Sequence, residues 1–253
     1  MSTHRALKIL RFVAHHQEPA SVKEISEHVQ LPRATVYRLV MMLEKEAVLQ
    51  RAGDSKLIEL SGSFLRSMIA GASNEQIVAG FEQALISAAN KWGATAFLGR
   101  LRTGLVEIVH AVTPPDKSSG YVHPGLNVRP AHACSSARAI LAFMPQDEID
   151  DVLGEDFTAL TDRTITDRAA VLEALRLTKE RGYAVCDEEV DVGITSVAVP
   201  AIVGRAGVIC SIGVVAASRR MHELGLSAIG QFLKTNARNA VLGLNQSLYE
   251  SRA

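Results

Sequence analysis

The chain has 253 residues and no net formal charge at pH 7, and its 47% of hydrophobic residues suffices for a sizeable core. No run of about 18 apolar residues occurs, which argues against a membrane span, and Lys8 and Arg11 interrupt residues 6–14, which argues against a signal peptide. Three cysteines at wide spacing argue against a disulfide framework and for a cytoplasmic protein.

Residues 21–46 have the pattern of two helices joined by a tight turn. Ser21 and Glu24 stand in the spacing of a capping box, which predicts a helix start. Pro32 disfavours continuing that helix and suits the first turn of the next one. The second helix places apolar residues at i, i+3, i+4 and i+7 on an inward face, and a preceding helix over residues 3–15 completes a three-helix core. This order is typical of a helix-turn-helix.

The outward side of the second helix carries basic and hydroxyl side chains at its N-terminal end. Arg suits phosphates and guanine edges, and Thr suits phosphates and base edges. Residues 48–50 and 57–60 then predict a hairpin around a Gly-Asp turn, a wing with basic residues near its tip. Solvated charges on a plain helical bundle are the alternative, which the wing disfavours. The expected DNA-contacting residues are Arg33, Ala34, Thr35, Tyr37, Arg38, Arg51 and Lys56.

Three segments are predicted: a DNA-binding domain over residues 1–60, a linker helix within 61–74, and a mixed α/β domain over 75–253. Residues 1–60 hold nine Lys and Arg against seven Asp and Glu, so DNA affinity must come from where the basic residues lie and from more than one copy. Later helices are expected over 64–70, 75–92, 134–144, 146–153, 167–181 and 224–249, and strands over 95–101, 105–112, 121–122, 183–186, 195–203 and 208–216. Dinucleotide, P-loop, nucleophile-elbow and zinc-site spacings are absent, so neither a cofactor nor a metal is expected.

Several blocks of the sequence resemble the IclR (isocitrate lyase regulator) family of transcriptional regulators. RALKIL at 5–10 and LPRATVYRLVMMLE at 31–44 are similar to its DNA-binding half, and residues 129–144, 160–189 and 192–202 are similar to its effector domain. The resemblance implies an α+β protein with an N-terminal winged helix-turn-helix, a linker helix and a C-terminal GAF-like α/β effector-binding domain. It also implies a homodimer or homotetramer that binds palindromic, double-stranded operator DNA with an affinity set by a small metabolite.

The resemblance also places an effector pocket. Where the family often has an Asp, a Cys and two Ser that hold small acids such as glyoxylate, this chain has Cys186, Ser196, Gly213 and Val215. The family's Thr-Ala-x-Gly-Lys-Ala run is replaced by residues 134–139, so Cys134, Ser135 and Ser136 join the expected pocket. We therefore expect a roomier, more apolar pocket and an aromatic or otherwise bulky organic-acid effector, for example a hydroxybenzoate-like catabolite.

An anionic effector needs a positive partner. Arg129 and His132 flank the start of the helix expected over 134–144, whose N-terminus itself favours an anion, and Arg100 is a second candidate. Structural roles are the alternative for both residues. Arg129 would then form an ion pair with an acid within 187–189, and the His132 imidazole would form a hydrogen bond with the backbone.

Two other functions remain open alternatives. One is an enzyme with Cys134 or Cys186 as nucleophile and His110, His123 or His132 as base. The other is a metal or redox sensor on the same DNA-binding scaffold, although the cysteines lack the C-x-x-C spacing. Neither accounts for residues 21–60 as well as a metabolite-responsive regulator does, so no catalytic residue is expected. The expected coupling runs through the angle between subunits, with repression and activation both open.

Overall fold

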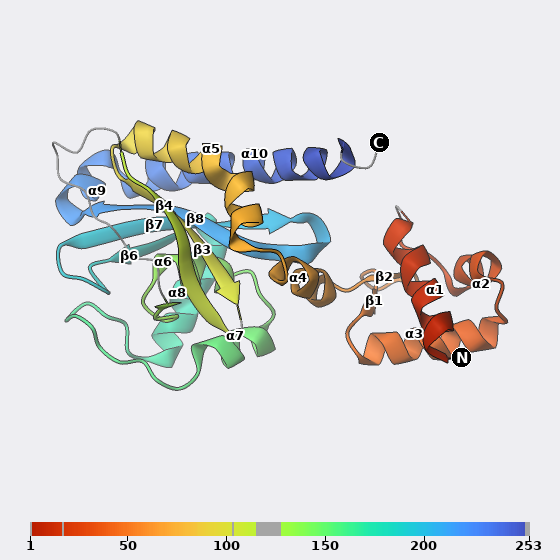
Figure 1. Ribbon diagram of the computed structural model, residues 1–253. Helices are drawn as coiled ribbons and strands as arrows, with labels where there is room; N and C mark the ends of the chain where they lie inside the picture. The colour runs from red at the N-terminus through yellow and green to blue at the C-terminus, as the bar shows by residue number, and fades with distance from the viewer. Residues whose placement is uncertain (1, 17, 103, 115–127, 251–253) are drawn as a thin grey trace. The chain divides into compact units, whose positions relative to one another are not determined.

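The computed structural model describes residues 2–16, 18–102, 104–114 and 128–250 (Figure 1). It divides into two compact units: unit 1 runs to Gly71 and includes Gly204–Ala206, and unit 2 holds the remainder. The helices of unit 1 are α1 (Ser2–His15), α2 (Val22–Val29), α3 (Arg33–Lys45) and α4 (Gly62–Ala70), its strands are β1 (Leu49–Arg51) and β2 (Ile58–Leu60), and η1 (Gly204–Ala206) is a 3-10 turn.

Unit 1 is a three-helix core closed by an antiparallel hairpin. The Ser21 hydroxyl accepts the Glu24 N–H at 3.2 Å, and the Glu24 carboxylate accepts the Ser21 N–H at 2.7 Å, so the predicted capping box starts α2. Gln30 then takes a left-handed conformation, with φ of 56°, and turns the chain into α3. Ile25 and Val36 are fully buried between the helices. The helix-turn-helix predicted from the sequence is therefore present.

Unit 2 is built on one antiparallel sheet that has six strands within the described residues, in the order β5-β4-β3-β8-β7-β6. The strands are β3 (Thr95–Arg102), β4 (Leu105–Val112), β5 (Val128–Arg129), β6 (Ala184–Asp187), β7 (Ile194–Val203) and β8 (Gly207–Ala217). The helices are α5 (Asn74–Trp92), α6 (Ser135–Leu141), α7 (Gln146–Leu153), α8 (Arg168–Arg181), α9 (Ser218–Leu224) and α10 (Leu226–Glu250).

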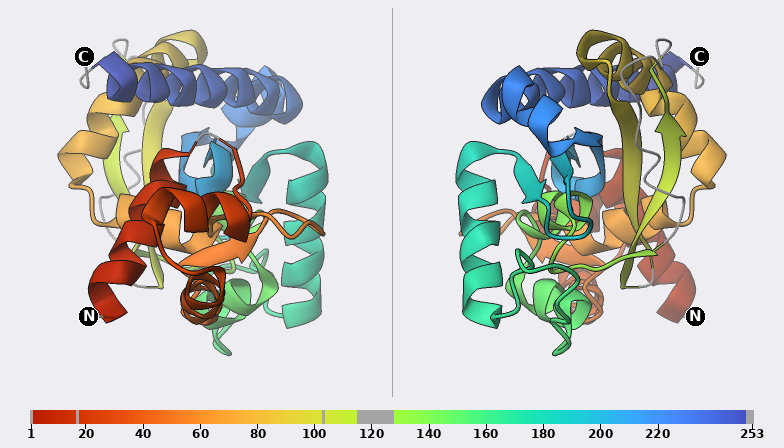
Figure 2. Two further views of the ribbon diagram at one scale, coloured as in Figure 1. Left: turned by 90° about the vertical axis from the view of Figure 1, so that its right-hand side faces the viewer. Right: turned by 90° about the vertical axis from the view of Figure 1, so that its left-hand side faces the viewer.

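Helices cover both faces of this sheet. In Figures 1 and 2, α5 and α10 lie alongside each other over one face, where the rings of Trp92 and Phe232 meet edge to face at 5.7 Å. The short helix α6 packs on the opposite face against β7, β8 and β3, with α8 outside it. The sheet and the start of α6 bound a space that several of the expected pocket residues line.

Several boundaries differ from those predicted. The helix expected over 134–144 is shorter, since α6 ends at Leu141. The helix expected over 167–181 begins at Arg168, because the Asp167 carboxylate accepts the Ala170 N–H at 2.8 Å and caps α8. α9 and the short edge strand β5 were not predicted. The strand expected over 121–122 lies outside the described residues.

Candidate DNA-binding surface and effector cavity

The N-terminal part of α3 presents its non-core side to solvent. Arg33, Ala34, Tyr37 and Arg38 are exposed and Thr35 is half-buried, while the residues between them face the core. Tyr37 is 51% exposed, so its ring and hydroxyl are accessible to a partner. The expected DNA-contacting side chains of this helix therefore share one accessible face.

The hairpin brings Arg51 and Lys56 close together, but they are held differently. The Arg51 guanidinium lies 2.6 Å from the Glu44 carboxylate and donates to the Lys56 carbonyl at 2.9 Å. It thereby ties the wing to α3, a role that the sequence analysis did not assign to it. The Lys56 side chain is exposed near the tip, where Gly53 turns with φ of 56°.

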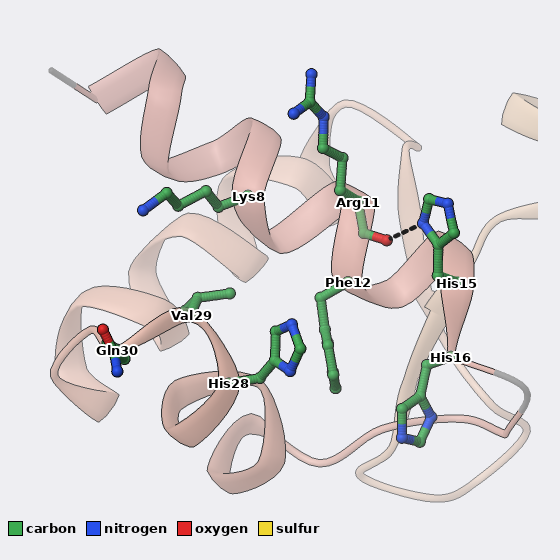
Figure 3. A pocket seen from close by; sticks show the side chains of 8 residues that line it. All are labelled: Lys8, Arg11, Phe12, His15, His16, His28, Val29 and Gln30. Atoms are coloured by element: carbon green, nitrogen blue, oxygen red, sulfur yellow. Dashed lines mark hydrogen bonds between the residues drawn. The ribbon is translucent and has the colours of Figure 1, made fainter.

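A basic groove of about 730 Å³ lies between α1 and α2 (Figure 3). Lys8, Arg11 and His15 follow one another at i, i+3 and i+7 along α1, on a different side from Ile9 and Val13, which pack in the core with α3. The groove is thus separate from the exposed face of α3. Its lining residues are Lys8, Arg11, Phe12, His15, His16, His28, Val29 and Gln30, with no acid among them.

In unit 2, a cavity of about 90 Å³ lies between the sheet and the start of α6. We call it the effector cavity. It brings together expected pocket residues that are far apart in the chain, since Arg129, Cys134, Ser135, Cys186, Ser196 and Val215 all line it. Its remaining walls are Phe97, Ile108, Val190, Asp191 and Ile194, none of which was predicted. Most of the lining is apolar.

Gly213 does not line this cavity, and the reason is Phe97. The two residues are partners in the register between β3 and β8. A Cβ atom built on Gly213 would lie 2.3 Å from Phe97 Cζ and 2.6 Å from the Val197 carbonyl oxygen. The glycine therefore makes room for the phenyl ring and does not enlarge the pocket, so the expectation that Gly213 lines the pocket was wrong.

Ser135 and Ser136 start α6 but point to different neighbours. The Ser135 hydroxyl is hydrogen-bonded to that of Ser196 at 2.7 Å, inside the cavity. The Ser136 hydroxyl is hydrogen-bonded to that of Ser211 at 2.7 Å. It fills the space above Gly99, because a Cβ atom built on Gly99 would lie 1.7 Å from Ser136 Oγ. Ser136 is therefore a packing residue outside the cavity.

His132 and Arg100 also lie away from the effector cavity. The His132 imidazole is hydrogen-bonded to the Thr158 carbonyl at 3.1 Å and meets Phe157 edge to face, as the structural alternative for this residue supposed. Arg100 is buried and donates to the Asn74 side chain at 2.8 Å, and this burial lowers the pKa of its guanidinium. Of the three basic candidates only Arg129 reaches the cavity.

The wall that contains Val190 and Asp191 is anchored by a buried ion pair. Arg138 of α6 holds the Glu189 carboxylate through two hydrogen bonds of 2.6 and 2.5 Å, with side-chain exposures of 3% and 10%. Arg138 also donates to the carbonyls of His132 and Val185. Within 187–189, Arg138 thus binds Glu189, and Arg163 lies near Asp187 and Glu188. The Arg138–Glu189 pair joins two walls of the cavity.

The cysteines are buried and have the character of core residues. Burial raises the pKa of Cys186 to about 12 and raises the pKa of Cys134 and of Cys210 as well. A thiol with so high a pKa is a poor nucleophile and a poor metal ligand. Among the described residues no group of His, Cys, Asp and Glu could hold a metal ion, and no helix has the length and apolarity to cross a membrane.

Comparison with family models decides the relationship. Residues 70–241 match the bacterial transcriptional regulator IclR C-terminal domain, and residues 2–53 match the IclR helix-turn-helix domain. The chain belongs to the IclR family. It is therefore a DNA-binding transcriptional regulator and not an enzyme, and the predicted fold class is confirmed.

Individual relatives span nearly the whole length of this IclR-family chain. The glycerol operon regulatory protein of Streptomyces griseus is 29% identical over 254 residues, covering 99% of this chain and 97% of the relative. The crystal structure of the Thermotoga maritima IclR has a TM-score of 0.60 at 23% identity over 96% of this chain and 98% of its own. An IclR homologue from Microbacterium hydrocarbonoxydans, complexed with 4-hydroxybenzoate, has a TM-score of 0.59 at 17% identity over 96% of this chain and 100% of its own. These structures share its fold.

Proposed function

We propose that this regulator binds operator DNA through the exposed face of α3 and the wing, and that a small organic acid in the effector cavity sets the affinity. The cavity supports the second half of this proposal, because its lining is mostly apolar and also contains the cation Arg129 and the Ser135 and Ser196 hydroxyls. Ligand sites commonly combine apolar walls with a few such polar groups. Residues 1–60, 61–74 and 75–253 are assigned the DNA-binding, linking and effector-binding roles.

The volume of the cavity limits the effector. At about 90 Å³ it is smaller than the roughly 150 Å³ cavity that can hold benzene. An acid with a single aromatic ring therefore needs more room than the cavity has in this structure. Within the aromatic or otherwise bulky class expected from the sequence, this volume favours a compact acid with one aromatic ring at most. The 4-hydroxybenzoate held by the Microbacterium homologue has this size.

The regulator acts as a homodimer or homotetramer on two operator half-sites. Movement of the cavity walls on effector binding changes the angle between subunits and with it the spacing of two copies of α3. Because the coupling is reciprocal, operator DNA changes effector affinity by the same factor.

The DNA-binding assignment is tested with Arg38→Ala. Loss of an Arg contact to phosphate or a base edge costs about 1–3 kcal/mol, roughly a tenfold to hundredfold loss of operator affinity per contact. Lys179→Ala on α8 is the matched control, since it removes one exposed positive charge from unit 2. Operator affinity equal to wild type in Arg38→Ala would exclude Arg38 from the interface.

The effector assignment is tested by the melting temperature of the full chain with single-ring aromatic and short aliphatic acids. A ligand at 100 times its Kd stabilises the state that it binds by about 2.7 kcal/mol. Stabilisation by a compact acid that is lost in Arg129→Gln supports the proposal. Stabilisation that persists in that variant would show that the acid binds at another site.

A further inference from the structure

The exposed face of α3 carries a line of apolar side chains. Ala34, Tyr37 and Met41 follow one another at i, i+3 and i+7, so they lie on the same side of the helix. Tyr37 and Met41 are each 51% exposed, whereas Val36 and Leu39 are buried on the side that faces the core. We call Ala34, Tyr37 and Met41 the apolar strip. Because these residues belong to one helix, the strip has a defined position on the surface of unit 1.

Positive charges border the apolar strip. Arg38 and Lys45 each lie one turn beyond a residue of the strip, and both are exposed. The only acid of α3 is Glu44, and its carboxylate lies 2.6 Å from the Arg51 guanidinium of the wing. The accessible face of α3 is therefore apolar along its middle and cationic at its border. Such a face fits a partner that presents apolar groups between anionic ones.

The major groove of DNA presents this combination. The 5-methyl group of thymine is an apolar group on the base edges of the groove, and phosphates lie along both sides of it. A helix that lies in the groove, as in homeodomains, turns residues at i, i+3, i+4 and i+7 toward the bases. In α3 this set consists of Ala34, Tyr37, Arg38 and Met41. It extends the expected DNA-contacting residues of α3 by one turn, to Met41.

We propose that the apolar strip recognises thymine through its 5-methyl group, and that Met41 is a specificity-determining residue of the regulator. The inference rests on the proposed role of α3 as the DNA-binding helix. The flexible thioether side chain of Met41 packs against the methyl group, and the ring of Tyr37 packs beside it from the preceding turn. Cytosine presents an amino group at this edge, for which the side chains of Ala34 and Met41 offer no strong acceptor. The strip therefore favours thymine and disfavours cytosine.

The test replaces thymine by deoxyuridine, which lacks only the 5-methyl group and keeps the base pair. An operator is first selected from a pool of random-sequence duplexes with the full-length wild-type protein. Each thymine of one half-site is then replaced in turn, and the dissociation constant is measured by fluorescence anisotropy. At the thymine that contacts the strip we expect about fourfold weaker binding, the effect of removing one methyl group from a buried contact.

The variant Met41→Ala identifies the side chain that makes this contact. Deoxyuridine at the same position should no longer weaken the binding of Met41→Ala, because the two changes remove the same contact. Met68→Ala is the matched control, since it truncates a methionine that is 62% exposed on α4, outside the recognition helix. It should keep the wild-type response to deoxyuridine.

Three outcomes would overturn the inference. The first is a selection that enriches no sequence, and the second is a selected operator in which deoxyuridine weakens binding at no position. The third is a response to deoxyuridine that is as large in Met41→Ala as in the wild type at every position. In the last two cases the DNA-binding role of α3 stands if Arg38→Ala loses affinity for the selected duplex. If Arg38→Ala binds that duplex like the wild type, the proposed role of α3 fails and the inference with it.

Discussion

Removing the charge of Glu189 should be the most damaging conservative change in unit 2. The Arg138–Glu189 pair is bidentate and nearly excluded from water, and breaking such a pair from one side costs about 3–5 kcal/mol because the remaining charge stays buried. For Glu189→Gln we expect about 3 kcal/mol, the lower end of this range. The glutamine keeps one acceptor oxygen, and Arg138 keeps its bonds to the carbonyls of His132 and Val185.

The measurement is urea unfolding followed by the fluorescence of Trp92, the only tryptophan of the chain, which lies in α5 of unit 2. Glu173→Gln is the matched control: it breaks the exposed pair with Arg176, so solvent screens the loss and no resolvable change is expected. Replacing both Arg138 and Glu189 by Met and Leu should cost less than Glu189→Gln alone, since no charge then remains buried. A Glu189→Gln protein within about 0.5 kcal/mol of wild type, a change typical of ordinary surface sites, would refute this account of the pair.

Two further predictions follow from the cavity walls. Gly213→Ala should destabilise unit 2 by about 1–3 kcal/mol through overpacking, because the new Cβ meets both the Phe97 ring and a strand carbonyl. If a combined Gly213→Ala and Phe97→Leu variant recovered none of the lost free energy of unfolding, overpacking against Phe97 would not be the cause. Cys186, with its pKa raised to about 12, has a thiolate fraction of roughly one part in ten thousand at pH 8. Its alkylation should therefore wait for unfolding, and rapid labelling of the native protein would show that the thiol is accessible and ionised.

The elements that local patterns define could be predicted from the sequence. The capping box of α2, the turn before Pro32 and the alternation of the strands depend on residues within a few positions of one another, and all are present in the structure. The predictions of secondary structure failed where a contact between distant residues determines the element. β5 has two residues and exists only through its pairing with β4, and no periodicity can show so short a strand.

Part of the effector cavity could be predicted and part could not. The resemblance to the family located Cys186 and Ser196, because aligning two sequences at a position does not require knowing which residues surround it in the fold. Whether Gly213 would open the cavity depended on Phe97, which lies far away in the sequence and becomes its neighbour only in the register of β3 and β8. The partner of Glu189 was missed for the same reason, since Arg138 is 51 residues away.

These differences change where selectivity for an effector can arise. At the positions where the family often has polar residues on the sheet, this chain has a buried cysteine, a glycine covered by Phe97 and Val215, and the remaining hydroxyls of Ser135 and Ser196 are bonded to each other. These positions limit the size of the ligand, but they offer few polar groups for hydrogen bonds to it. If the cavity binds an acid, as proposed, Arg129 is the cation of its lining and the apolar side chains limit the size of the ligand. Substitution of Arg129 should then weaken the binding of every acid, and substitutions at Phe97 or Val215 should change how large an acid is accepted.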